Sequence, residues 1–325
     1  MSEAVVSTRV RLARNLKEYP FPIRLNTAQA KEIVAKVDEA LQGSDLKFTR
    51  IDLGTISDTM KAALLERHLI SPDFVRAGEG RAVFLSEDSS VSIMVNEEDH
   101  IRLQVIRDGF EPDEAYKIAD KLDDMISRRL KFAFHERLGY LTQCPTNLGT
   151  GMRASVMLHL PALDMTGAVH RIGANLSKLG LTIRGLYGES SRPVGAFFQL
   201  SNQVTLGISE KSAIDNLRNI TTQLISQEMK ARDNVLGNIE VEDKISRALG
   251  TLKTALLMDH SEAMSLLSLV RLGVSSKKLT TLSTDSIDKL IVEIQPASIM
   301  TRFGEDMTPR ERDIKRAEII RERFN

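Results

Sequence analysis

Five arginines lie in short segments that combine a strand pattern or a turn with a permanent positive charge. They are Arg9 and Arg11 in STRVR, Arg102 in NEEDHIR, Arg153 in CPTNLGTGMRAS and Arg184 in RGLYGE. Each guanidinium offers a planar fork of donors, so five of them converging from one sheet would bind a polyphosphate. The alternative is that each arginine pairs with a surface carboxylate, the usual state of a single arginine in a chain of balanced charge.

The sequence lacks the motifs of several other phosphate-dependent or metal-dependent proteins. It contains no GxxxxGK[ST], no HRD followed by DFG, no HExxH and no CxxC. Local sequence therefore does not support a P-loop enzyme, a protein serine, threonine or tyrosine kinase, a zinc protease or a zinc ribbon. The six histidines are dispersed, which argues against a structural metal site.

Composition limits the class of protein further. The 325 residues include 44 Lys and Arg against 44 Asp and Glu, so a generally basic surface for nucleic acid is not expected. The single Cys144 cannot form an internal disulfide, which favours a reducing compartment. No apolar run approaches the ~18 residues that cross a bilayer, and the N-terminal segment has no apolar signal core. We expect a cytoplasmic protein with no nucleic-acid and no membrane partner.

One predicted hairpin would bring acidic and basic side chains together. Apolar residues alternate over 91–106, and the polar residues 96–99 form a turn-like connector, so this range predicts two strands that each bury one face. Extending the alternation of the second strand backwards puts Glu98, His100 and Arg102 on a common side. A carboxylate and a guanidinium would then face the same space.

The remaining patterns predict an α+β region followed by helices. Residues 27–42 and 112–130 carry apolar residues at helical spacing, and Asn26 and Gln29 give the first of these helices a capping-box-like start. Strand-like runs cover 144–159, 181–187 and 195–207, one helix covers 161–179, and helical patterns alone continue from about 209 through 240–258, 261–272, 284–294 and 308–323. We expect an α+β catalytic domain over 1–234 and a small all-helical C-terminal domain over 235–325, because Gly237 interrupts the pattern.

Taken in order, the arginine-bearing segments resemble the signature blocks of the phosphagen (guanidino) kinase family. NEEDHIR, CPTNLGTGMRAS and RGLYGE follow STRVR, and ERHLISP near His68, LHLPAL at 158–163 and FQLSNQVTLG at 198–207 extend the resemblance over nearly the whole length. Within this family, the residues of these motifs are most similar to those of the bacterial McsB-type protein arginine kinases. The resemblance implies an antiparallel sheet flanked by helices and ATP-dependent phosphorylation of protein arginine, which marks proteins for regulated proteolysis in the stress response.

Arginine phosphorylation needs a carboxylate, because a guanidinium keeps its proton and delocalises its lone pair. The resemblance assigns Glu98 and Glu189 as the pair that clamps the substrate guanidinium, with Glu98 as the base. Without the resemblance, Glu98 would be interpreted as a solvated carboxylate of a turn and Glu189 as a carboxylate of a loop. The resemblance also puts Cys144 beside the substrate, where a thiolate with a pKa lowered by neighbouring arginines would aid catalysis without acting as a nucleophile. The alternative for Cys144 is a small buried hydrophobe.

By the same resemblance, the five arginines hold the phosphates of ATP and stabilise charge as the γ-phosphoryl group moves. Mg²⁺ would be held largely by phosphates and water, so no carboxylate cage is expected. The other residues that the resemblance places in the ATP pocket are Ser7, Thr8, Val10, His68, Ala154, Ser155, Val156, Met157, Gly185, Leu186, Tyr187 and Gly188.

A second motif lies near the C-terminus. Composition alone makes PRERDIKRAEIIRERF a solvated amphipathic helix. The residues Arg312, Asp313, Arg316 and Ala317 match the RDxxRA motif, which implies an allosteric phosphoarginine pocket. Arg312 and Arg316 are spaced i and i+4, so both can reach one phosphoryl group, while Asp313 could pair with the guanidinium of the phosphoarginine.

Two features depart from the family pattern. The small-molecule members carry a separate helical domain ahead of the STRVR block, whereas this block starts here at Ser7, and the open cleft that we expect suits a protein substrate. Arg192 and Pro193 follow Glu189 where relatives usually have an acidic residue and no proline. A positive charge there would repel a substrate guanidinium, or would read an acidic sequence context.

Two alternatives to a protein arginine kinase stay open. One is a kinase of free arginine or another small guanidino compound, and the other is a weakly active adaptor that binds phosphoarginine through 312–317. Retention of both Glu98 and Glu189 argues against the adaptor. The resemblance further implies several partners: protein substrates with exposed arginine, a zinc-containing activator protein, a heat-shock repressor, the ClpC-ClpP protease, and a second copy of the chain in a homodimer.

Overall fold

The structure, a computed structural model, describes residues 2–76, 78–185, 194–280, 282–304 and 306–325. It forms two compact units. The hairpin unit comprises Ser7–Val156 and Ser201–Arg218, and the helical unit comprises Met1–Val6, Met157–Leu200 and Asn219–Asn325. The helical unit takes residues from both sides of position 234, and the predicted domain boundary stays a prediction. No helix in the described part of the chain is both long and apolar enough to cross a bilayer.

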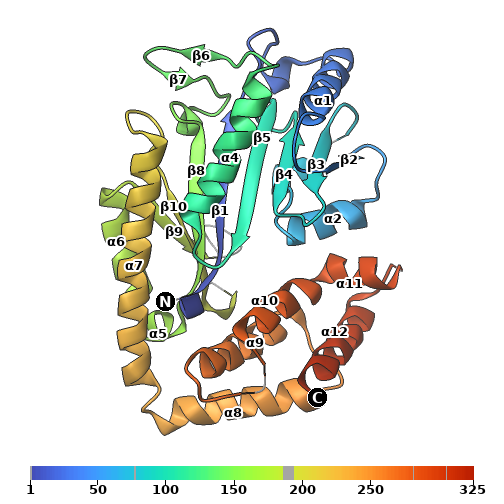
Figure 1. Ribbon diagram of the computed structural model, residues 1–325. Coiled ribbons are helices and arrows are strands. Elements are labelled where there is room, and N and C mark those ends of the chain that lie inside the picture. The colour runs from blue at the N-terminus through green and yellow to red at the C-terminus, as the bar shows by residue number, and fades with distance from the viewer. Residues whose placement is uncertain (1, 77, 186–193, 281, 305) are drawn as a thin grey trace. The chain divides into compact units, whose positions relative to one another are not determined.

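Eight strands form one sheet (Figure 1). They are β1 (Val5–Arg14), β2 (Phe48–Asp52), β3 (Ala82–Ser86), β4 (Val91–Val95), β5 (Ile101–Asp108), β8 (Met152–His159), β9 (Leu181–Gly185) and β10 (Phe197–Asn202). Their order is β2-β3-β4-β5-β1-β8-β10-β9, and the pairs from β2 to β1 are antiparallel. The β4–β5 pair confirms the predicted hairpin. A separate two-stranded ribbon joins β6 (Phe134–His135) to β7 (Gly139–Tyr140).

Helices cover both faces of the hairpin. The helices of this unit are α1 (Thr27–Leu41), α2 (Asp58–Glu66), α3 (Pro72–Val75), α4 (Pro112–Ser127) and the first part of α7 (Glu210–Val235). Met94 of β4 packs with Leu64 of α2 and Phe74 of α3, while α1 contacts β4 and α4 contacts β5. All five residues of β4 are buried, so the prediction of one buried face is wrong for this strand.

The predicted start of α1 is confirmed. The Asn26 side chain accepts a hydrogen bond from the backbone N–H of Gln29 at 2.9 Å, and the Gln29 side chain accepts one from the backbone N–H of Asn26 at 3.2 Å. This capping box satisfies two backbone donors that the first helical turn leaves unpaired.

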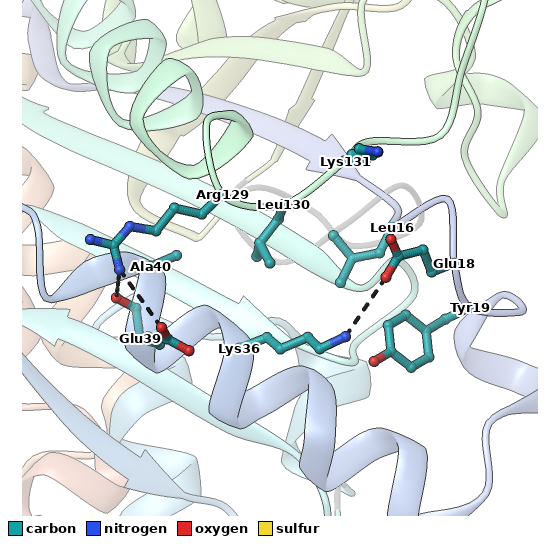
Figure 2. A pocket seen from close by; sticks show the side chains of 9 residues that line it. All are labelled: Leu16, Glu18, Tyr19, Lys36, Glu39, Ala40, Arg129, Leu130 and Lys131. Atoms are coloured by element: carbon teal, nitrogen blue, oxygen red, sulfur yellow. Dashed lines mark hydrogen bonds and ion pairs between the residues drawn. The ribbon is translucent and has the colours of Figure 1, made fainter.

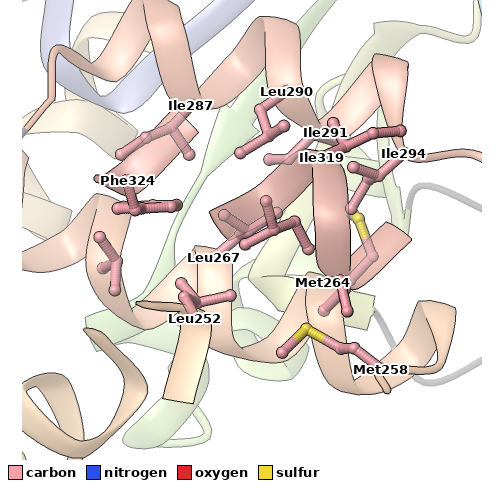
Figure 3. Packing of buried hydrophobic residues seen from close by; sticks show 14 of the residues in the cluster. Leu252, Met258, Met264, Leu267, Ile287, Leu290, Ile291, Ile294, Ile319 and Phe324 are labelled. Carbon is pink, nitrogen blue, oxygen red and sulfur yellow. The ribbon is translucent and has the colours of Figure 1, made fainter. Parts of the chain in front are cut away.

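The helical unit buries a second apolar core (Figure 3). Its helices are α5 (Pro161–Met165), α6 (Ala168–Lys178), the rest of α7, α8 (Ile239–Thr254), α9 (His260–Ser275), α10 (Thr284–Glu293), α11 (Pro296–Phe303) and α12 (Pro309–Phe324). Leu252 of α8, Leu267 of α9, Leu290 of α10 and Phe324 of α12 meet in this core and are 6 % exposed or less. Burial of such side chains is the main force that holds these short helices together. Short 3-10 helices complete the chain: η1 (Ser2–Ala4), η2 (Pro22–Arg24), η3 (Pro145–Asn147) and η4 (Val194–Ala196).

Two local predictions are wrong, and one helix was missed. The single helix over 161–179 is broken into α5 and α6 at Gly167, whose φ of 66° is left-handed. Helix α11 was not predicted, and it begins at Pro296. The alternation of β5 does not extend back to Glu98, because the strand starts at Ile101 and the preceding residues form bends that begin with Asn96 at a φ of 62°.

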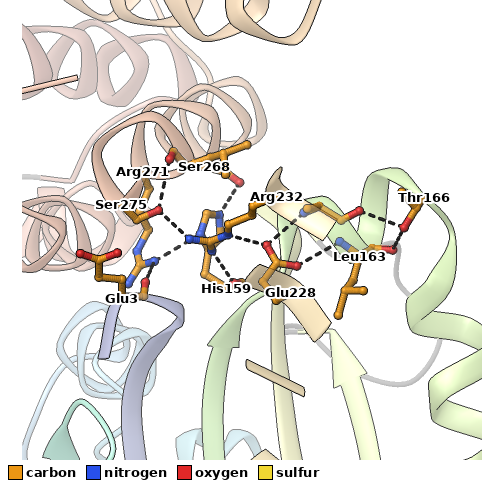
Figure 4. Close-up of polar contacts among 11 residues, drawn as sticks. Glu3, His159, Leu163, Thr166, Glu228, Arg232, Ser268, Arg271 and Ser275 are labelled. Carbon is orange, nitrogen blue, oxygen red and sulfur yellow. Dashed lines mark hydrogen bonds and ion pairs between the residues drawn. The ribbon is translucent and has the colours of Figure 1, made fainter. Parts of the chain in front are cut away.

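A buried polar network lies where β8 meets the helices of this unit (Figure 4). Arg271 of α9 donates to both carboxylate oxygens of Asp288, at 2.7 and 2.8 Å, and to His159 Nδ1 at 3.2 Å. Because arginine can only donate, His159 accepts at Nδ1 and carries its proton on Nε2, which lies 2.8 Å from Ser268 Oγ. Burial, then the charges of Arg271 and Arg232, lower the pKa of His159 well below its usual value, so the ring is neutral.

Glu228 of α7 extends this network to α5. Its carboxylate accepts from the backbone N–H groups of Ala162 at 3.2 Å and Leu163 at 3.0 Å, which satisfies orphan donors of the first turn of α5. Arg232 donates to the same carboxylate at 2.7 Å, so this fully buried charge is paired.

Candidate active site

Three of the five predicted arginines project from one face of the sheet. In the β1–β5 pair, Arg11 lies opposite Gln104 and Ala13 lies opposite Arg102. Residues that face each other across an antiparallel pair point to the same side, and alternate residues of a strand share a side. Arg9, Arg11 and Arg102 therefore belong to one face.

The charges of these arginines act on one another and on Arg153 of β8. Burial, then the charges of Arg102 and Arg153, lower the pKa of Arg9 to about 10. Burial, Arg9 and the other two arginines lower the pKa of Arg11, against an opposing effect of Glu97. Among the described residues, neither Arg9 nor Arg11 has an ion-pair partner. Four guanidiniums held this close, two of them uncompensated within that part of the chain, form a site for a polyanion.

Glu97 fixes one of these arginines and the backbone beside it. Its buried carboxylate accepts hydrogen bonds from Ser71 Oγ at 2.5 Å, Arg102 Nη1 at 2.7 Å and the backbone N–H of Glu98 at 2.8 Å. Burial acts to raise the pKa of Glu97, but Arg102, Ser71 and the Glu98 N–H outweigh it and lower the pKa. Glu97 therefore stays ionised and holds the loop of residues 96–100, called the 96–100 loop below, against the arginine face.

Glu98 is half-buried, and its pKa shifts in the opposite direction. Burial, then the charges of Asp99 and Glu97, raise the pKa of Glu98, while Arg102 and a hydrogen bond with Cys144 act against the rise. A carboxylate that binds a proton more readily than an exposed one suits a general base. The two adjacent glutamates of one motif thus have different environments and different chemical capacities.

Cys144 lies beside Glu98. Its thiol hydrogen-bonds to the Glu98 carboxylate, and its Sγ is 3.1 Å from Thr146 Oγ1. Asn147 of the same segment points its Nδ2 at Glu98 Oε2, at 3.4 Å. The structure thus brings together the predicted base and cysteine. The arginine neighbours predicted for this thiol are not among its contacts in the described part of the chain.

The side chain of Asn15 hydrogen-bonds to two residues of the 96–100 loop. Asn15 Nδ2 donates to Asp99 Oδ1 at 2.5 Å, and Asn15 Oδ1 accepts from the backbone N–H of His100 at 2.9 Å. His100 Nδ1 accepts from the backbone N–H of Leu16 at 2.9 Å, so Nε2 carries the proton and donates to the Pro20 oxygen at 2.9 Å. Burial lowers the pKa of His100 to about 4, so this anchor is a neutral imidazole.

His68 lies beside the arginine face. Its backbone oxygen accepts from Gln104 Nε2 at 2.7 Å, and its φ of 59° turns the chain after α2. Although the residue is exposed, the surrounding protein and the charge of Arg9 lower the pKa of its ring to about 4. The structure thus brings a neutral ring to the side of the predicted phosphate site.

The other predicted ATP-binding residues of β1 and β8 divide between two faces. Ser7 shares the side of Arg9, and Ser155 shares the side of Arg153. The residues that point the other way and are fully buried are Thr8, Val10, Ala154 and Val156. The hydroxyl of Thr8 donates at 2.7 Å to a backbone oxygen in the turn between β5 and α4. Met157 packs on the core of the helical unit.

The remaining predicted residues belong to the helical unit or lie outside the described part of the chain. Arg184 and Gly185 end β9, which belongs to the helical unit. The predicted residues that lie outside the described part are Leu186, Tyr187, Gly188, Glu189, Arg192 and Pro193. The role of Glu189 as the second carboxylate that binds the substrate guanidinium therefore stays a prediction. The effect of Arg192 and Pro193 on the substrate also stays a prediction.

The C-terminal motif residues Arg312, Asp313, Arg316 and Ala317 lie on α12. Arg316 is 1 % exposed and donates to the backbone oxygens of Met258 and Ile294, each at 3.0 Å, and to Asp313 at 2.5 Å. Arg312 is half-buried, and one of its nitrogens donates to a backbone oxygen ahead of the helix at 2.8 Å. The two guanidiniums do not converge at one exposed surface in this structure.

Comparisons with known proteins define the family. A model of the ATP:guanido phosphotransferase C-terminal catalytic domain matches residues 29–231, and a model of the protein-arginine kinase McsB C-terminal domain matches residues 238–325. The chain belongs to the ATP:guanido phosphotransferase family and carries the McsB-type C-terminal domain. Its α+β fold and its class, a phosphotransferase that acts on a guanidino group, are thereby confirmed.

Two relatives are similar over more than nine-tenths of their length. A protein named protein-arginine kinase from Clostridium tetani is 44% identical over 325 residues, which cover 99% of this chain and 96% of that protein. One of the same name from Brevibacillus brevis is 45% identical, with 99% and 92% covered.

Two solved structures share the fold over part of the chain. The duplicated taurocyamine kinase from Schistosoma mansoni, with bound transition state analog components, has a TM-score of 0.63 at 30% identity, covering 70% of this chain and 33% of that one. Lombricine kinase has a TM-score of 0.64 at 25% identity, with 70% and 67% covered.

Proposed function

We propose that this protein transfers the γ-phosphoryl group of ATP to the guanidinium of arginine side chains in other proteins. The observation that carries the proposal is the coupled cluster of Arg9, Arg11, Arg102 and Arg153 beside Glu98, whose pKa is raised. The cluster suits a polyphosphate, and the carboxylate suits a cationic nucleophile that must lose a proton. The names of the full-length relatives support arginine in proteins as the acceptor.

In the proposed reaction, a substrate guanidinium nitrogen attacks the γ-phosphorus of ATP. The nitrogen–phosphorus bond forms, the bond to the β,γ-bridging oxygen breaks, and ADP leaves. Glu98 takes the proton that the attacking nitrogen loses. The four arginines neutralise charge on the phosphates in a site where Arg9 and Arg11 are already desolvated, so they need little reorganisation during transfer.

Glu97 acts in this scheme as a positioning residue. It joins Arg102 on the phosphate side to the backbone N–H of Glu98 on the acceptor side through one buried carboxylate. Its negative charge also raises the pKa of Glu98, which makes that group a better proton acceptor. Cys144 and Asn147 contact the base from the opposite segment and orient it.

Magnesium enters the proposal as part of the nucleotide substrate. Within the described residues, no group of three or more His, Cys, Asp or Glu side chains could hold a metal ion. We therefore assign it no protein ligand, and no step above depends on one.

The experiment is incubation with Mg-ATP and either an unstructured arginine-rich protein or free arginine, with acid-labile phosphate read out by mass spectrometry. Phosphoarginine on protein supports the proposal. Phosphorylation of free arginine alone would move the chain to the small-molecule branch, to which the similar taurocyamine and lombricine kinase structures belong by name. Glu98→Gln is the inactive variant, and Glu87→Gln on the exposed β3–β4 turn is its matched control.

We extend the proposal to the setting that the family resemblance implies. The protein works in the cytoplasm as a homodimer during stress, an activator and a heat-shock repressor bind it, and the ClpC-ClpP protease degrades its phosphorylated clients. Phosphoarginine recognition by the α12 motif belongs to the same proposal, with half-buried Arg312 as the accessible guanidinium. Co-purification of partners with wild type but not with Glu98→Gln would support the dependence of client delivery on phosphorylation.

A further inference from the structure

A cavity of about 510 Å³ adjoins the segment that hydrogen-bonds to His100, and no arginine of the cluster lines it (Figure 2). It is bounded by α1, by the segment that follows β1 and by the residues after α4. Its floor is apolar, since Leu16, Ala40 and Leu130 are each at most 8 % exposed. The volume is within the range of sites for small organic molecules.

Three cations and two carboxylates line this cavity. Lys36 lies 3.7 Å from Glu18, and Arg129 donates to the backbone oxygen of Glu39 at 3.1 Å, with its carboxylate at 4.0 Å (Figure 2). Lys131 also lines the cavity, and across the described ranges it has no ion-pair partner. Lys36, which also lies 3.3 Å from Glu32 outside the lining, and Arg129 are thus already matched by carboxylates. The exposed ammonium of Lys131 remains to attract an anion.

One wall of the cavity is bonded to the loop that carries Glu98. The backbone N–H of Leu16 donates to His100 Nδ1 at 2.9 Å. The ring of Tyr19 stands edge-on to the His100 imidazole, with centroids 6.2 Å apart and planes at 77°. His100 is buried and neutral. A movement of Leu16 or Tyr19 would therefore change the hydrogen bonds of His100 and, through them, the position of Glu98 two residues earlier.

We propose that this cavity binds a small organic carboxylate with an aliphatic or aromatic body, and that its occupancy reaches Glu98 through Tyr19 and His100. The apolar floor receives the body of the ligand, and Lys131 receives its carboxylate. A single uncompensated cation fits one carboxylate better than a multiply charged phosphate. The proposed binding of the carboxylate does not depend on the kinase function. The proposed effect of binding on Glu98 rests on the proposed kinase function.

Binding is tested on the full chain with phenylacetate, and with phenylacetamide as a neutral compound of the same shape. Saturation-transfer NMR should detect phenylacetate and give a weaker signal for the amide. Lys131→Gln should weaken phenylacetate binding about twofold to fivefold, the worth of an exposed ion pair. Lys117→Gln on the exposed side of α4 is the matched control and should leave it unchanged. Equal binding of acid and amide, or no binding of either at millimolar concentration, overturns the site.

Coupling is tested by the imidazole resonances of His100 and by the kinase rate. Phenylacetate should shift the His100 resonances of wild type and change kcat, while those of His135, on the separate β6–β7 ribbon, stay in place. In the Lys131→Gln variant, the shift of the His100 resonances and the change in kcat should both need a correspondingly higher concentration of phenylacetate. Binding that leaves His100 and kcat unchanged overturns the coupling. A chain without kinase activity that still shows the His100 shift refutes the proposed function and leaves the site intact.

Discussion

Replacement of Glu98 by glutamine removes the proposed base and almost nothing else. The amide has the same shape, and its oxygen can still accept from Asn147, which lies 3.4 Å from the carboxylate. Arg102 keeps its direct partner Glu97 at 2.7 Å, so the phosphate site loses no hydrogen bond. A general base contributes about 100-fold to 10,000-fold to a rate, or about 3–5 kcal/mol in activation free energy. We expect kcat to fall by that factor and ATP affinity to stay nearly unchanged.

The assay is phosphoarginine formation on an unstructured arginine-rich protein, with nucleotide binding measured separately and Glu87→Gln as the control. The pH profile adds a second criterion. In wild type, kcat should fall as pH falls through the pKa of Glu98, which lies above the usual carboxyl value because of burial, Asp99 and Glu97. Turnover of Glu98→Gln equal to wild type would remove this residue from the chemistry. A loss of ATP binding in proportion to the loss of rate would assign it a structural role.

Three further predictions concern residues that the site and the fold depend on. Glu97→Gln leaves one of the three donors to this buried carboxylate unpaired and should lower kcat by about 10-fold to 100-fold, with the same control and assay. Asp288→Asn takes the charged partner from buried Arg271 and should lower the free energy of unfolding by up to about 3 kcal/mol in urea titrations; an unchanged midpoint would contradict a paired buried charge. Because the pKa of His100 is lowered to about 4 in the folded state, the unfolded chain binds more protons below about pH 6.5. Stability should therefore fall by about 3 kcal/mol as pH drops from 6.5 to 4, and His100→Gln should reduce that loss.

Local patterns predicted those parts of the fold whose cause is local. The capping box of α1 and the β4–β5 hairpin depend on residues a few positions apart, and both are confirmed. The double burial of β4 depends on three helices that precede it in the chain, α1, α2 and α3, so its alternating sequence could not reveal it. The break between α5 and α6 required reading Gly167 as a left-handed residue, although the apolar spacing continued across it.

In the candidate site, too, local sequence predicts some features, whereas others depend on tertiary contacts. The strand pattern was sufficient to expect Arg9, Arg11 and Arg102 on a common sheet, and pairing across β1 and β5 brings them to one face. It could not distinguish Glu97 from Glu98, because both are acidic residues in one polar connector. Their pKa values shift in opposite directions because Ser71, which is 26 positions away, and Arg102 hydrogen-bond only to Glu97. The distinction therefore depends on tertiary contacts.

The motif on α12 shows why spacing alone overestimates what two side chains can share. An i, i+4 interval puts Arg312 and Arg316 on one side of a helix, but the packing of the helix decides how deeply each is buried. Arg316 bonds to backbone oxygens of Met258 and Ile294 from two other segments, so it ties α12 to the rest of the unit. Replacement of both arginines would mix a loss of binding with a loss of stability. Because Arg312 is half-buried and makes one backbone hydrogen bond, its single replacement is the change that separates phosphoarginine recognition from folding.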